Sequence, residues 1–244
     1  MQSTLSQVAI YGESNLRDHG SVTTTAPPRI ALSDLGPIAQ LRAGRIGRRL
    51  VQLYAGLLLY GFSIALMVRS DLGLAPWDVL HSGLTKWFPI DIGQALVLVS
   101  FVVMLAWIPL REIPGVGTIS NALVIGLSTD LFLAVLAAPG SIGLRIVLLV
   151  SGVALQGAAT AAYIGAQLGR GPRDGLMTGL ARRSGRSLRL VRTLMELAVV
   201  ALGLLLGGVA GIGTIVYALS IGPLSQALLP SFLVPMAEGD DVSG

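Results

Sequence analysis

Residues 72–84 read LGLAPWDVLHSGL, and residues 168–180 read LGRGPRDGLMTGL. The two stretches lie 96 residues apart and are identical at seven of thirteen positions. A second pair has the same offset, because residues 115–126 (GVGTISNALVIG) and residues 211–222 (GIGTIVYALSIG) are identical at eight of twelve positions. The constant offset predicts that two copies of one structural unit make up most of the chain. We place these units at residues 48–140 and 141–233.

The composition is that of a protein embedded in a lipid bilayer. The 244 residues are 53% hydrophobic and 12% charged, and their mean hydropathy is +0.75. A soluble domain carries about 25% charged residues. A helix needs roughly 20 apolar residues to cross the bilayer, so the sequence predicts an all-α, polytopic transmembrane bundle of about six spans. The predicted spans are residues 49–69, 92–110, 117–136, 144–167, 190–206 and 214–229.

The distribution of basic residues predicts the orientation. Six Arg lie among the first 49 residues and six more lie in residues 170–189, whereas the connections after the first and third spans hold three Lys or Arg in total. Basic connections stay on the cytosolic side, so we expect both termini in the cytosol. Residues 1–47 are expected to be a disordered polar extension, with a helix near 37–47, and residues 234–244 a short acidic tail.

Each unit holds three spans, which is an odd number. The second unit must therefore enter the bilayer from the side opposite to the first. The charges agree, because the connection after the first span has two basic residues and the matching connection after the fourth span has six. Inverted repeats of this kind are a recurrent plan of secondary transporters.

The repeated phrase predicts two short helices that begin after a break. Pro suits the first turn of a helix, and Asp is favoured at the helix N-terminus, which places Pro76 and Asp78 at one start. Two interpretations stay open. The helices lie at the interface, where Trp77, Trp87 and His81 suit an interfacial belt, or they dip into the bilayer and line a central cavity.

Small and turn-forming residues recur in both units. Glycines let helices approach closely, within one chain or between chains of a homo-oligomer. The predicted structural motif consists of Gly73, Pro76, Gly83, Gly117 and Thr118 in the first unit and Gly169, Pro172, Gly179, Gly213 and Thr214 in the second.

Polar residues within the apolar units are candidates for a substrate or ion pathway, because charges there are costly and need a reason. Glu196 can pair with Arg192 one turn away or carry a proton. Asp130 can face the outer mouth, and the mid-span polar side chains can bind substrate or tie helices together. The candidates are Tyr60, Asp78, Asn121, Asp130, Gln156, Asp174 and Glu196.

Several kinds of chemistry have no support in the sequence. The chain has no Cys and two His, which excludes disulfides and thiolate sites and argues against a metal. There is no phosphate-binding loop with its Lys-Ser/Thr pair, and no catalytic set converges. We therefore expect no enzyme activity, no cofactor and no nucleic-acid partner.

The motif residues resemble the bacterial YczE/YitT-type integral membrane family over about residues 48–230. The resemblance implies a bacterial inner-membrane protein, and an association of some relatives with antibiotic export implies an exporter. The second unit departs from the motif, with Arg173 and Met177 in place of Trp77 and His81. The resemblance rests on Leu72, Gly73, Pro76, Trp77, Asp78, Gly83, Pro109, Gly115, Gly117, Thr118, Asn121 and Asp130.

These observations favour a secondary transporter that exports a small organic molecule, such as an antibiotic-like metabolite, across the inner membrane. The alternative is a membrane scaffold or regulator, in which the basic residues 182–192 dock a cytosolic partner or anionic lipid. The expected partners are the lipid bilayer, a small-molecule substrate and a second copy of the chain.

Overall fold

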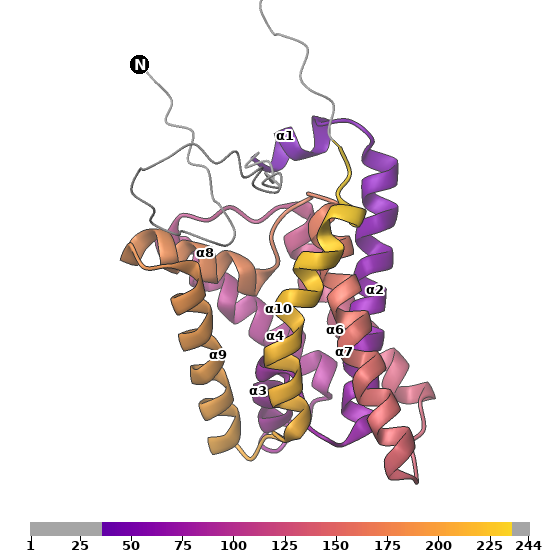
Figure 1. Cartoon of the computed structure of the whole chain (residues 1–244). Coiled ribbons are helices and arrows are strands. Elements are labelled where there is room, and N and C mark those ends of the chain that lie inside the picture. Colours follow the sequence, from indigo (N-terminus) through magenta and orange to yellow (C-terminus); the bar gives the residue numbers. More distant parts are fainter. Residues whose placement is uncertain (1–35, 236–244) are drawn as a thin grey trace, which may run out of the picture.

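In the described part of the chain, residues 36–235 of a computed structural model, helices are the only regular secondary structure (Figure 1). The predicted all-α membrane bundle is thereby confirmed. Five helices are long and apolar enough to cross a membrane. They are α2 (Ile46–Ser70), α4 (Ile92–Leu105) continued by α5 (Trp107–Leu110), α6 (Val116–Val135), α7 (Ile142–Gly165) and α10 (Ile212–Phe232).

The helix α9 (Leu188–Leu205) occupies the remaining predicted span. Its 18 residues include three charged residues, Arg189, Arg192 and Glu196, whereas each of the five spans contains an 18-residue stretch with at most two. Three shorter helices complete the fold, namely α1 (Pro37–Arg42), α3 (Pro76–Leu84) and α8 (Pro172–Ser184). The helix expected near residues 37–47 is α1. Most of the predicted disordered extension and of the acidic tail lies outside the described residues.

The two halves of the chain are built alike. Every main helix of the first half begins 96 residues before a helix of the second half. The matching starts are Ile46 and Ile142, Pro76 and Pro172, Ile92 and Leu188, and Val116 and Ile212.

The two halves also hold each other through matching contacts. The carbonyl oxygen of Leu72 accepts a hydrogen bond from the amide of Gly213 at 2.8 Å, and its counterpart Leu168 accepts from Gly117 at 2.7 Å. The loops around these carbonyls turn sharply at Gly73 and Gly169, whose φ angles are +123° and +127°. Such angles favour glycine, which explains why the sequence repeats it before each short helix.

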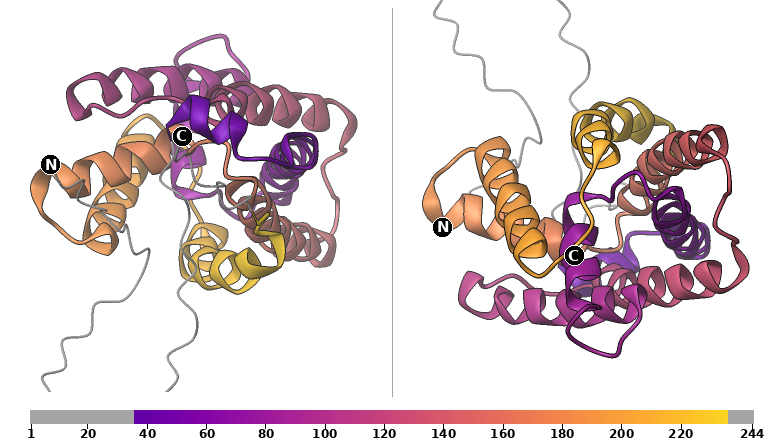
Figure 2. Two further views of the ribbon diagram at one scale, coloured as in Figure 1. Left: turned by 90° about the horizontal axis from the view of Figure 1, so that it is seen from above. Right: turned by 90° about the horizontal axis from the view of Figure 1, so that it is seen from below.

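Helices α2 and α7 pack along each other at the centre (Figures 1 and 2). A Cβ atom at Gly56, early in α2, would lie 3.0 Å from the amide nitrogen of Tyr163, late in α7. At the other end a Cβ atom at Gly152, early in α7, would lie 2.8 Å from Cγ of Met67, late in α2. The two helices therefore run antiparallel, and these two glycines at matching positions pack within one chain.

The four other long helices, α4, α6, α9 and α10, are packed unequally. Helix α4 lies along α6, whereas α9 and α10 make at most marginal contact in the part of the chain that the structure describes (Figure 2). A Cβ atom at Gly126 of α6 would lie 2.5 Å from the carbonyl oxygen of Gly93 in α4, but one at the counterpart Gly222 of α10 would meet no heavy atom within 4 Å. The pair α4–α6 of the first unit is therefore closed, and the matching pair α9–α10 of the second unit is open.

Candidate functional site

The short helices α3 and α8 meet at their N-terminal turns in the interior of the bundle. The guanidinium of Arg173 on α8 lies 5.5 Å from the centroid of the Trp77 ring on α3, which is within the range of a cation–π contact. These two residues occupy matching positions of the two units, so the units meet at this pair. Trp77 is 9% exposed, and the prediction that it belongs to an interfacial belt is wrong.

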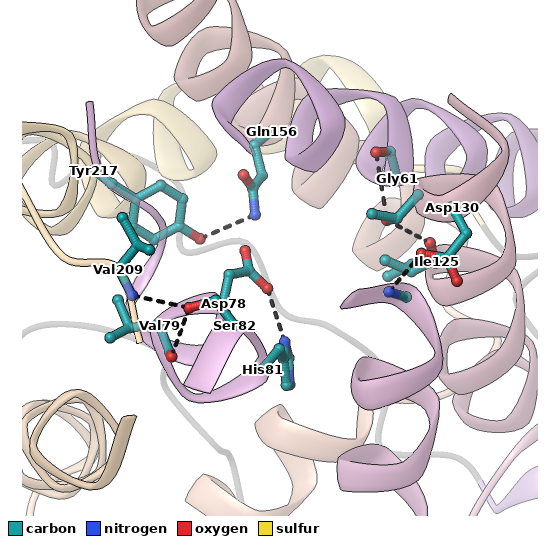
Figure 3. Close-up of polar contacts among 12 residues, drawn as sticks. Gly61, Asp78, Val79, His81, Ser82, Ile125, Asp130, Gln156, Val209 and Tyr217 are labelled. Atoms are coloured by element: carbon teal, nitrogen blue, oxygen red, sulfur yellow. Dashed lines mark hydrogen bonds and ion pairs between the residues drawn. The ribbon is translucent and has the colours of Figure 1, made fainter. Parts of the chain in front are cut away.

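Asp78 follows Trp77 and is buried together with His81. Nδ1 of His81 lies 3.0 Å from Oδ1 of Asp78, and each residue is 1% exposed. The two side chains face each other because they are three residues apart on one face of α3. The interpretation of His81 as an interfacial residue is therefore also wrong. Figure 3 shows Asp78 pointing towards Gln156 and Tyr217 and away from Asp130, which lies on α6 beside α4.

Three tyrosines from different helices surround the two short helices. The hydroxyl of Tyr163 on α7 donates a short hydrogen bond to the carboxylate of Asp174 on α8. The ring of Tyr163 packs edge to face against Tyr60 of α2, with centroids 6.2 Å apart, a favoured aromatic geometry. The amide Nε2 of Gln156 lies 3.3 Å from the hydroxyl of Tyr217 on α10.

These side chains form one buried to half-buried polar group that draws on α2, α3, α7, α8 and α10. We refer to it as the central cluster, and it comprises Tyr60, Trp77, Asp78, His81, Gln156, Tyr163, Arg173, Asp174 and Tyr217. Polar and ionisable groups at the centre of a membrane bundle mark functional pathways. In the described residues no group of three or more His, Asp or Glu side chains could hold a metal ion.

A pocket of about 300 Å³ adjoins the cluster on the side of α3. Ser82 lines it, one helical turn beyond Asp78, together with Asp71, Asp91 and Val209. The Ser82 hydroxyl accepts a hydrogen bond from the amide of Val209 at 3.0 Å, which holds the chain before α10 against α3.

Comparison with known proteins agrees with this architecture. Residues 47–230 match the model of a family of unknown function, DUF6198. The chain belongs to the DUF6198 family. It is 41% identical to an uncharacterized protein of Haemophilus influenzae, with 72% of this chain and 81% of the relative covered. It is 32% identical to the uncharacterized membrane protein YczE of Bacillus subtilis, with 72% and 83% covered.

The chain is also 28% identical to the uncharacterized protein YyaS of Bacillus subtilis, with 72% of this chain and 89% of the relative covered. No solved structure matches the chain. The resemblance to the YczE-type family is thus confirmed. The names of these relatives support a membrane protein and describe no activity.

The structure brings four of the seven predicted pathway residues into the central cluster, namely Tyr60, Asp78, Gln156 and Asp174. Asn121 is 5% exposed and lies beside the start of α8, where its Nδ2 would be 3.3 Å from a Cβ atom at Gly171. It is therefore a neighbour of the cluster.

Two predicted residues lie elsewhere. Glu196 pairs with Arg192 on α9 at 2.8 Å, which fits the intrahelical alternative. Asp130 on α6 accepts a hydrogen bond from the amide of Gly93 at 2.7 Å, so it caps the first turn of α4. The carboxylate satisfies a donor that has no partner within its own helix.

Replacing Asp130 by Ala is expected to lower the free energy of unfolding by about 1.5–3 kcal/mol, because a hydrogen bond to a charged group is lost and a backbone donor is left unpaired. The matched control is Gln226→Ala, at the corresponding exposed position of α10. We expect the control to leave stability unchanged. Thermal unfolding of the purified protein in detergent measures both, and equal losses in the two variants would show that Asp130 is not a cap.

Arg173 is a member of the cluster that the sequence does not single out as a site residue. It was noted only as a departure from the motif, although its counterpart Trp77 carries the motif. The signal that could have found it is the 96-residue offset itself, because positions that meet across the two units have to be complementary rather than identical.

Proposed function

We propose that this chain is a secondary transporter of the bacterial inner membrane, built from two inverted three-span repeats around the central cluster. The observation that carries the proposal is the pair of broken helices, α3 and α8, whose N-terminal turns meet at Trp77 and Arg173. Transporters place discontinuous helices at the interface of their repeats, with the substrate site between them.

Inversion is supported by the packing of the repeats. Two matching helices that run antiparallel and exchange matching contacts are related by a twofold axis perpendicular to them. Helices α2 and α7 meet in this way, with Gly56 against Tyr163 and Gly152 against Met67. Since both helices cross the membrane, that axis would lie in the membrane plane, as in transporters with inverted repeats.

The unequal packing of the two units supports alternating access. An inverted repeat can exchange the conformations of its halves and thereby expose the same site to the other side. A closed pair α4–α6 beside an open pair α9–α10 is the difference between the units that such an exchange would require. We propose a small organic molecule as the substrate. We also propose that both termini lie in the cytosol, because basic connections stay on that side.

Two of the docking residues of the scaffold alternative also have contacts within the chain, although their side chains are exposed. Arg182 lies 2.9 Å from Glu112 and also donates to the carbonyl oxygen of Leu110. Arg183 donates to the carbonyl oxygen of Pro109 at 2.9 Å. Both side chains thus hold α8 against α5. We propose transport rather than catalysis, since the central cluster holds no arrangement of a nucleophile with its base.

Single cysteines test the inversion in this cysteine-free chain. Phe88 and Ser184 are both exposed and occupy matching positions after α3 and at the end of α8. We expect an impermeant maleimide to label Phe88→Cys in intact cells and to label Ser184→Cys only after permeabilisation. Labelling of both positions from the same side would contradict the inverted repeat and with it the transporter.

A further inference from the structure

Arg173 differs from the other deeply placed arginine of the bundle. Arg49 is fully buried, and its guanidinium donates to three backbone carbonyl groups. Arg173 is half-buried, and within residues 36–235 its guanidinium makes no hydrogen bond; its close contact is the face of the Trp77 ring. A guanidinium has five N–H donors, and inside a protein they need acceptors.

The two nearby carboxylates do not fill this role. Asp78 is held by His81 and Asp174 by Tyr163. Both act on Arg173 through their charge, but neither forms an ion pair with it within 4.0 Å. Because these carboxylates are engaged elsewhere, the guanidinium of Arg173 has no acceptor within hydrogen-bond distance among the described residues.

Arg173 adds a positive charge to a helix N-terminus that also holds the carboxylate of Asp174. It is the second residue of α8, whose first residue is Pro172. The N-terminus of a helix carries a partial positive charge, so a cation there is unfavourable unless an anion binds. The N-terminal turn of α3 faces the same place through Trp77. Two helix N-termini and a guanidinium without a hydrogen bond therefore converge, as at the anion sites of transporters, although the carboxylates of Asp78 and Asp174 lie in the same two turns.

A second unpartnered polar group lies in the same cluster. Gln156 is 0% exposed, and its Oε1 has no hydrogen-bond partner, although its Nε2 bonds to Tyr217. A buried acceptor without a donor is costly. A ligand whose hydroxyl or amino group reaches this oxygen would satisfy it.

We propose that the substrate is a small organic acid whose carboxylate is held by Arg173 and whose neighbouring hydroxyl or amino group contacts Gln156; this rests on the proposed transport function. The planar fork of a guanidinium matches both oxygens of a carboxylate. The aromatic side chains Trp77, Tyr60 and Tyr163 favour a substrate with an apolar or aromatic body.

Protection from chemical modification tests the anion site in the full-length protein in lipid nanodiscs. Phenylglyoxal modifies unpaired arginines, and peptide mass spectrometry reports each site. We expect Arg173 to react faster than Arg49. Four probes with the same phenyl group then compete, namely 3-phenyllactate, 3-phenylpropionate, 3-phenylpropionamide and 3-phenylpropylamine.

We expect 3-phenyllactate to protect Arg173 best, 3-phenylpropionate less, and the neutral and cationic probes not at all. An Arg173 that reacts as slowly as Arg49 would overturn the proposal. Protection by the amine alone, or by none of the four probes, would overturn it as well.

Equilibrium binding of tritiated 3-phenyllactate provides the second measurement. We expect Arg173→Gln to weaken binding at least about tenfold, because a charge-assisted bidentate contact is lost, and Arg173→Lys to weaken it less. The matched control is Arg183→Gln, at the far end of the same helix, which should bind as the wild type does. Equal affinity of Arg173→Gln and wild type would contradict the assignment.

Flux of the same probes into proteoliposomes separates this inference from the proposed function. Binding of 3-phenyllactate that depends on Arg173, without flux, would sustain the anion site and contradict transport. Flux of 3-phenylpropylamine that is unchanged in Arg173→Gln would sustain transport and contradict the anion site.

Discussion

Leucine in place of Gly126 is expected to prevent stable folding, whereas leucine in place of Gly222 is expected to be tolerated. The two positions match across the repeat. A Cβ atom at Gly126 would lie 2.5 Å from the carbonyl oxygen of Gly93, and this backbone atom cannot yield without separating α4 from α6. At Gly222 no heavy atom lies within 4 Å. We expect Gly126→Leu to cost about 3 kcal/mol or more, the upper range for overpacking.

The comparison is internally controlled because both substitutions place the same side chain in the interior of a helix, where Leu is a better helix former than Gly. Size-exclusion chromatography after a series of heat steps gives the midpoint of unfolding for each variant. We expect the Gly222→Leu midpoint to stay within a few degrees of wild type. A similar loss in both variants would mean that α9 approaches α10 in the resting protein as closely as α4 approaches α6.

Replacing Arg49 by Ala is expected to have a comparably large effect on folding. The buried guanidinium donates to the carbonyl oxygens of Gln40, Ala166 and Gln167 at 2.5, 2.9 and 2.6 Å. Two of these carbonyls, those of Ala166 and Gln167, directly follow the last residue of α7, where acceptors have no partner within the helix. Their loss leaves several buried acceptors unpaired, so we expect the free energy of unfolding to fall by about 3 kcal/mol or more.

The matching arginine of the second unit is the control. Arg145 pairs with Asp71 at 3.0 Å, but the two side chains are 35% and 65% exposed. Exposed ion pairs contribute about 0–1 kcal/mol, so Arg145→Ala should unfold almost as wild type does. Expression and thermal unfolding of both variants decide the matter. An Arg49→Ala protein as stable as Arg145→Ala would show that the three carbonyl contacts do not hold α7 to the N-terminal segment.

Much of the fold follows from the sequence because its signals are local. Apolar length predicts the spans, and Pro76 and Pro172 mark the starts of α3 and α8. The 96-residue offset predicts that the helices recur. The offset predicts less about how tightly the helices pack. Helix α9, the counterpart of α4, carries three charged residues and stands apart from α10.

The site was predictable only in part. Hydropathy and helical spacing identify polar residues at depth, such as Gln156 and Asp78, but they do not say which helices face each other. Trp77 suited a membrane interface by residue type alone, yet it lies inside because α3 is enclosed by α4 and α9. Its partner Arg173 breaks the repeat for a physical reason. Residues that meet across a twofold axis contact their own counterparts, and two arginines there would repel each other whereas Trp and Arg attract.

Disulfide trapping between α9 and α10 tests most directly the claim that the two units exchange conformations. Val97 of α4 contacts the Gly126 position of α6, and the matching residues of the second unit are Thr193 and Gly222, which do not touch. Cysteines at Thr193 and Gly222 would meet only when α9 closes on α10. An oxidant captures such a state even when it is brief, and mass spectrometry detects the linked peptides.

We predict that the Thr193→Cys/Gly222→Cys protein forms this disulfide in membranes under copper-phenanthroline oxidation. The control pair Thr193→Cys/Ile215→Cys, two turns away on α10, should stay reduced. Absence of the 193–222 link, or equal linking of both pairs, would contradict the exchange of conformations and the transport mechanism built on it.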